Sequence, residues 1–126
     1  MSTILAVDDS ATMRRCLQIT FEGTEFNLVT VERSEAALER VKSLSPDLVI
    51  ADVSLSPGDG YELCSTIKLA SPHTPVLMLS SKQNPFDPSR GAQADDHLDK
   101  PFDTQVLQDK ARELIRAVPR SDTDVP

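Results

Sequence analysis

The chain has 126 residues, 39% of them hydrophobic, and its few aromatic residues are four phenylalanines and one tyrosine, so one domain with a mainly aliphatic core is expected. Its 20 acidic and 13 basic side chains give a net charge of −7, which argues against binding to nucleic-acid phosphates or to an anionic membrane surface. No apolar run reaches the ~18 residues of a membrane span. Asp8 and Asp9 interrupt the first apolar run, which disfavours a signal peptide. We therefore expect a cytoplasmic protein that does not bind membranes, with Cys16 and Cys64 as reduced, buried thiols.

Strand patterns and helix patterns alternate along the chain. In the first part the predicted order is a strand at 4–7, a helix at 13–21 capped by Ser10 or Asp9, a strand at 26–31, a helix from a Ser34 cap to about 45, and a strand at 48–51. The strand at 48–51 is apolar without interruption, which is typical of a strand covered on both faces.

The same alternation continues to residue 115. The predicted order is a helix from an Asp59 cap to about 70, a strand at 75–79, a short helix from an Asp87 cap and Pro88 to about 93, a weak strand around 97–98, and a helix from an Asp103 or Thr104 cap to 115. Strands joined by helices of this length are parallel. The prediction is thus a single-domain, doubly wound (βα)5 fold over residues 1–118, with 119–126 as a tail or the start of a linker.

Polar side chains end four of the five predicted strands. Asp8 and Asp9 end the first strand, Asp52 the third, Ser80 the fourth and Lys100 the fifth. Ligands of open parallel sheets bind beyond these strand ends. Crowded carboxylates stay ionised only beside a counter-charge, for which Mg²⁺ is suited. With an amine and a hydroxyl nearby, such a site binds a phosphoryl group, and one carboxylate is free to attack phosphorus and form an acyl phosphate.

The chain resembles the receiver domain of two-component response regulators, of the CheY-like chemotaxis type, over about residues 3–118. The motifs that carry the resemblance are VDDSATMRR at 7–15, DLVIAD at 47–52, DGYEL at 59–63, PVLMLS at 75–80 and ADDHLDKPF at 94–102. The resemblance implies a flavodoxin-like sheet with strand order 2-1-3-4-5. It also implies a phosphorylation-dependent switch of a phosphorelay, with a place in chemotaxis or motility signalling.

The resemblance further implies a role for each site residue. Asp52 would accept a phosphoryl group from a histidine kinase or a phosphotransfer protein, and Lys100 would bridge Asp52 and that group. The Mg²⁺ ligands would be Asp8, Asp9, Asp52 and the backbone carbonyl of Ser54. Ser80 would bind a phosphoryl oxygen and shift on activation, together with His97, and the Lys100–Pro101 peptide would be cis.

The chain would not be an enzyme with a separate substrate, because it would catalyse only its own phosphorylation and dephosphorylation. By the same resemblance, Ser54 and Lys82 would occupy positions that tune how fast water attacks the acyl phosphate. The signal would pass to a downstream protein target, or to an output domain that is missing from these 126 residues.

The sequence departs from the family pattern at four places. Ser56 stands where the family usually has proline, which follows here as Pro57, and His97 replaces an aromatic switch residue. Gln93 stands where glycine is usual, and the segment from Ser80 to Lys100 is compressed and contains prolines. These departures leave a second interpretation open: a pseudo-receiver adaptor that binds partners without phosphorylation. A Mg²⁺-dependent phosphohydrolase is a weaker alternative, because Ser54 stands where such enzymes carry a second aspartate.

Overall fold

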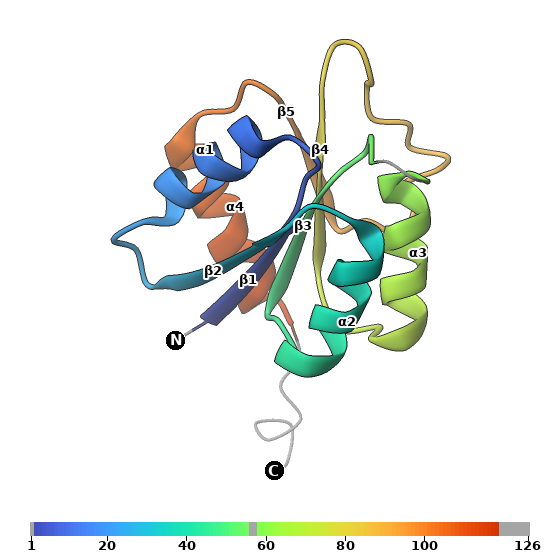
Figure 1. Cartoon of the computed structure of the whole chain (residues 1–126), viewed down its shortest axis with the longest axis horizontal. Coiled ribbons are helices and arrows are strands. Elements are labelled where there is room, and N and C mark those ends of the chain that lie inside the picture. The colour runs from blue at the N-terminus through green and yellow to red at the C-terminus, as the bar shows by residue number, and fades with distance from the viewer. Residues whose placement is uncertain (1, 56–57, 119–126) are drawn as a thin grey trace.

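A computed structural model of the chain describes residues 2–55 and 58–118 (Figure 1). Five parallel strands form one sheet in the order β2-β1-β3-β4-β5, which confirms the predicted flavodoxin-like topology. The elements in chain order are β1 (Ser2–Val7), α1 (Ala11–Phe21), β2 (Phe26–Val31), α2 (Ser34–Leu44), β3 (Leu48–Asp52), α3 (Gly60–Ala70), β4 (Val76–Ser80), β5 (Asp96–Asp99) and α4 (Thr104–Arg116).

The sheet is covered on both faces (Figure 1). Helices α2 and α3 bury Val41 and Ile67 against Val49 and its neighbours on one face. On the other face, α1 and α4 bury residues such as Leu17 and Leu107. Because successive strand residues point to opposite faces, β3 and β4 are buried along their whole length, as their apolar runs predict. None of the helices within the described ranges is long and apolar enough to cross a bilayer.

Side chains cap three of the helices as the sequence predicts. The Ser10 hydroxyl accepts the Met13 N–H at the start of α1, the Asp59 carboxylate accepts the Glu62 N–H at the start of α3, and the carboxylate of Asp103 caps α4. The predicted Ser34 cap of α2 is wrong by one residue. Arg33 takes the N-cap position without a side-chain hydrogen bond, and Ser34 is already helical.

The predicted short helix at 88–93 is wrong, so five strands alternate with only four helices in the described residues. The Asp87 carbonyl accepts the N–H groups of Arg90 and Gly91 at 3.1 and 2.9 Å, which closes a single turn. The Ala94 N–H then bonds back to the Gly91 carbonyl instead of continuing a helix. Phe86 and Ala94 pack on the α2/α3 core, and these contacts prevail over the local helix signal.

One of the two predicted buried thiols is exposed. Cys64 is buried in α3 as predicted, whereas Cys16 lies on the exposed side of α1. Helix α1 buries Leu17, Thr20 and Phe21. Cys16 is displaced by about 100° around the helix from Leu17, which takes it out of the buried stripe. The predicted tail at 119–126 and the Ser56–Pro57 departure lie outside the described residues.

Candidate functional site

The ends of β1, β3 and β5 bring one lysine between two aspartates. Lys100 donates from Nζ to Asp8 Oδ2 at 3.1 Å and also to Asp52 Oδ2. Asp8 is separated from Lys100 by 92 positions in the sequence, and Asp52 by 48. The three side chains meet because the carboxyl ends of parallel strands share one edge of the sheet.

Asp8 is the most deeply buried charge of the site, with an exposed fraction of 1%. Its Oδ1 accepts the Ser10 N–H at 2.9 Å, and its main-chain carbonyl accepts a hydrogen bond from Arg14 at 2.8 Å. Burial raises the pKa of Asp8, because it outweighs the Ser10 hydrogen bond and the charge of Lys100. The carboxylate therefore lacks full charge compensation in this environment.

Lys100 is held in its charged form by the same cluster. Burial alone would lower the pKa of Lys100, but the hydrogen bond to Asp52 and the charges of Asp8 and Asp52 outweigh it, and the pKa is raised. The Lys100–Pro101 peptide bond is cis, as the family resemblance implies.

Asp52 ends β3 with its side chain 12% exposed, so it is less deeply buried than Asp8. Its Oδ1 accepts the Ser54 N–H at 2.8 Å, while Oδ2 accepts from Lys100. The start of α3 lies directly against this residue. A Cβ atom on Gly60 would lie 1.9 Å from the Asp52 carbonyl oxygen, so only glycine allows the close approach.

The other predicted site residues are less closely joined to this centre. Ser80 has an exposed fraction of 1%, and its hydroxyl donates to Asp99 Oδ1, the residue opposite it in the β4–β5 register. Asp9 and Lys82 are exposed. Across 2–55 and 58–118, no hydrogen bond joins Ser80, Asp9 or Lys82 to Asp52.

His97 also lies on β5, two positions before Asp99, and its exposed ring stacks on Phe86 with centroids 4.0 Å apart and planes within 4°. Phe86 belongs to the irregular segment 81–95 between β4 and β5. The family resemblance implies a role for His97, whereas nothing in the sequence indicates that Phe86 is its partner. A single phenylalanine between prolines carries no signal of where its ring packs.

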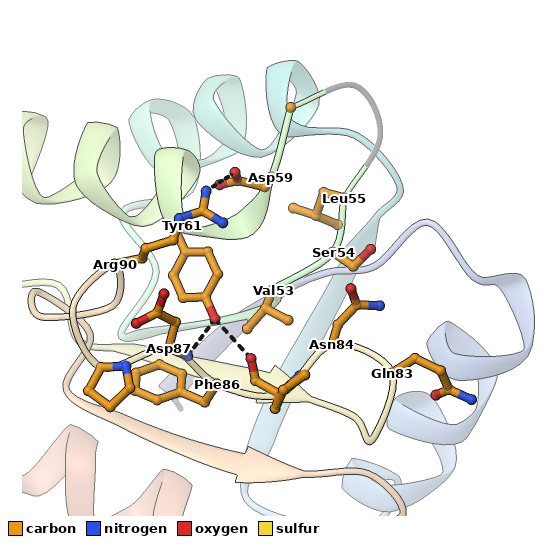
Figure 2. A pocket seen from close by; sticks show the side chains of 13 residues that line it. Val53, Ser54, Leu55, Asp59, Tyr61, Gln83, Asn84, Phe86, Asp87 and Arg90 are labelled. Atoms are coloured by element: carbon orange, nitrogen blue, oxygen red, sulfur yellow. Dashed lines mark hydrogen bonds and ion pairs between the residues drawn. The ribbon is translucent and has the colours of Figure 1, made fainter.

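The segment 81–95 packs against α3. Beside this contact lies a pocket of about 580 Å³, and Ser54 and Asn84 are among the residues that line it (Figure 2). The Tyr61 hydroxyl accepts the Asp87 N–H at 2.9 Å and faces the Pro85 carbonyl (Figure 2). Arg90 pairs with the Asp59 carboxylate and lies 4.5 Å above the centre of the Tyr61 ring. These contacts, rather than the helix predicted at 88–93, hold the segment against α3.

The carboxylates at this edge do not form a ready-made metal site. Within the described ranges, no group of three or more histidine, cysteine, aspartate or glutamate side chains is gathered to hold an ion. Nevertheless, the donors fit Mg²⁺, which needs only one or two carboxylates when waters and phosphate oxygens complete its shell. Burial of Asp8 without full charge compensation is the condition that a bound cation relieves.

Comparison with known proteins agrees with this geometry. Residues 4–112 match the family described as response regulator receiver domain. The chain is 37% identical over 117 residues to the response regulator protein GraR of Staphylococcus epidermidis, covering 91% of this chain and 52% of GraR. It is 32% identical over 115 residues to the alkaline phosphatase synthesis transcriptional regulatory protein PhoP of Bacillus subtilis, covering 90% of this chain and 48% of PhoP. The chain thus spans about half the length of these curated relatives.

Solved structures show the same fold. A putative response regulator from Chloroflexus aurantiacus superimposes with a TM-score of 0.84 at 29% identity, covering 91% of this chain and 98% of that one. The chemotaxis protein CheY4 of Vibrio cholerae superimposes with a TM-score of 0.80 at 26% identity, covering 90% and 98%. From the matched residues and the shared fold, the chain belongs to the response regulator receiver domain family, the phosphorylation-dependent switch of two-component signalling.

Proposed function

We propose that Asp52 is the residue that accepts the phosphoryl group, and that a histidine kinase or a phosphotransfer protein supplies it. The observation that supports this most is the position of the Asp52 carboxylate. It is partly accessible at the end of β3, one oxygen is oriented by the Ser54 N–H, and the other is paired with Lys100. A carboxylate held in this way has a defined direction of attack.

In the proposed reaction, an Asp52 oxygen attacks phosphorus while the bond between phosphorus and the donor's histidine nitrogen breaks. The histidine nitrogen leaves with the bonding electron pair and the acyl phosphate remains on Asp52. Lys100 neutralises charge on the incoming oxygens, since it is held charged beside Asp52. Later attack by water releases phosphate, and Ser54 and Lys82, which flank the site in sequence, would tune this step.

Mg²⁺ would be held by Asp8, Asp9 and Asp52 with the Ser54 carbonyl. When bound, it would neutralise the phosphoryl oxygens and the buried Asp8. The chain would then be no enzyme toward a separate substrate, since it catalyses only its own modification. Its product is a changed surface that a downstream target or an output domain reads, as in the chemotaxis-type resemblance.

The test is a titration with Mg²⁺ and beryllofluoride, followed by NMR amide shifts around Ser80 and His97. We expect large shifts in the wild type and none in Asp52→Asn, because the variant lacks the carboxylate that beryllofluoride needs. Asp109→Asn on the exposed side of α4 is the matched control and should respond as wild type does. A wild type that does not respond would favour the pseudo-receiver adaptor, and an Asp52→Asn response equal to wild type would place the acceptor elsewhere.

A further inference from the structure

The Ser80 hydroxyl has a carboxylate partner on the neighbouring strand. Ser80 and Asp99 are opposite each other in the parallel register of β4 and β5, and Ser80 Oγ donates to Asp99 Oδ1. The serine is buried with an exposed fraction of 1%, whereas Asp99 lies exposed on the edge strand. A hydrogen bond to an ionised acceptor is stronger than one between neutral groups. In this structure the hydroxyl proton of Ser80 is therefore already used in the hydrogen bond to Asp99.

A hydroxyl has a single proton to donate. If Ser80 gives it to Asp99, only its oxygen lone pairs remain for a group bound at Asp52. Lone pairs repel the anionic oxygens of a phosphoryl group, so Ser80 must leave Asp99 before it can stabilise that group. Asp99 thus competes with the phosphoryl group for the same proton.

We propose that Asp99 is a positioning residue that holds the Ser80 hydroxyl away from the phosphoryl group and so weakens phosphorylation of Asp52. The inference rests on the proposed function of Asp52, and it adds a residue that opposes phosphorylation of Asp52. Asp99 acts through Ser80 rather than on the reacting atoms. Asp99 also sits on the same face of β5 as His97, two positions earlier, so Ser80 bonds to the strand that carries the His97–Phe86 stack.

The experiment measures the affinity for beryllofluoride at fixed Mg²⁺, and the rate of phosphorylation by acetyl phosphate, in the full chain. Asp99→Ala should tighten binding and raise the rate by about fivefold, the gain expected when a charged competitor for one hydrogen bond is removed. Asp99→Asn keeps the shape and an acceptor oxygen without the charge, and should fall between wild type and Asp99→Ala. Glu113→Ala, which removes one exposed negative charge from α4, controls for net charge and should match wild type.

The decisive comparison repeats Asp99→Ala in a Ser80→Ala background. If Asp99 acts through the serine, the second substitution has no effect there, because there is no proton left to compete for. An equal gain in both backgrounds would mean that Asp99 repels the phosphoryl group directly, which overturns the proposal. An Asp99→Ala affinity equal to wild type also overturns it.

A second measurement needs no variant. In the wild type, the side-chain carboxyl ¹³C resonance of Asp99 should move when Mg²⁺ and beryllofluoride bind, because the hydrogen bond from Ser80 is lost. A resonance that stays in place while Ser80 and His97 amides shift overturns this inference and leaves the role of Asp52 intact. A chain that binds no beryllofluoride at all overturns both.

Discussion

At the residue scale, the balance of charge at Asp8, Lys100 and Asp52 governs the site. Two carboxylates share one ammonium, and one carboxylate is almost completely buried. The raised pKa of Asp8 comes first from burial, so the site without a metal carries a charge that the fold disfavours. A bound cation would offset this cost, because it would supply the missing positive charge beside Asp8.

Asp8→Asn should therefore raise the stability of the metal-free protein. An acid whose pKa is raised in the folded state costs stability at neutral pH, and this cost disappears only as the pH falls toward 3.8. Lys100 keeps Asp52 as its partner in the variant. We expect a gain of about 1 kcal/mol, or ~4 °C in Tm for a domain of this size.

The measurement is a thermal melt with and without millimolar Mg²⁺. The wild type should be stabilised by Mg²⁺, and Asp8→Asn should lose most of this increment because it lacks one of the proposed carboxylate ligands. A variant that is less stable than wild type without metal would contradict the assignment of Asp8 as an undercompensated charge.

At the scale of elements, the loop between β4 and β5 shows how tertiary contacts replace a helix. The Asp87–Pro88 start signal is real, and one turn forms there. The chain then leaves the helical path because Gly91 lies under the Phe86 ring, where an added Cβ would come within 2.4 Å of the ring. Stacking of Phe86 on His97 and the anchoring of Asp87 to Tyr61 hold the segment in place.

Two glycines at element ends should respond differently to alanine. Gly23 follows α1 with a φ of +76° and open space around it, so Gly23→Ala should cost about 1 kcal/mol of backbone strain. Gly60 begins α3 against the Asp52 carbonyl, and Gly60→Ala should cost ~3 kcal/mol or more, because main chain must move. Urea denaturation of both variants measures this, and an equal cost for the two would contradict the close approach at Gly60.

At the scale of the whole molecule, acidic side chains stabilise the fold through partners spread over its surface. The hydrogen bonds from Arg112 lower the pKa of Glu25 to about 2. Burial alone would raise the pKa of Asp59 and of Asp96, but hydrogen bonds at each carboxylate, with Arg90 and Lys110 among the donors, outweigh burial and lower both. Asp8 is the counterexample with its raised pKa.

The stability of the protein should fall as the pH drops from about 5 toward 2. Carboxyl groups with lowered pKa values contribute stability above their ordinary values of 4.5 for Glu25 and 3.8 for the aspartates, and lose it as they are protonated in the fold. Urea midpoints over this range at constant ionic strength test the sign. Glu25→Gln should flatten the dependence, and added salt should weaken it. Stability that rises on acidification would mean that Asp8 dominates.

Much of the fold followed from local patterns. The apolar runs of β3 and β4, the caps at Ser10, Asp59 and Asp103, and the alternation of strands with helices are all written in residues close together in the chain. The convergence of Asp8, Asp52 and Lys100 also followed, because parallel strands place their carboxyl ends at one edge and the motifs resemble a known family.

Other features depended on residues that are distant in sequence and close in space. The pairing of Ser80 with Asp99 needs the register of β4 against β5, and the Phe86–His97 stack needs the path of a loop without regular structure. The exposure of Cys16 depends on which side of α1 meets the sheet. The sequence alone determined the family, the sheet and the charged centre, since each is encoded by spacing and residue type. Only the tertiary structure decided which side chains these charges and hydroxyls pair with. Each hydrogen bond or ion pair joins side chains that are far apart in the sequence, and no local sequence pattern shows how close they lie in space.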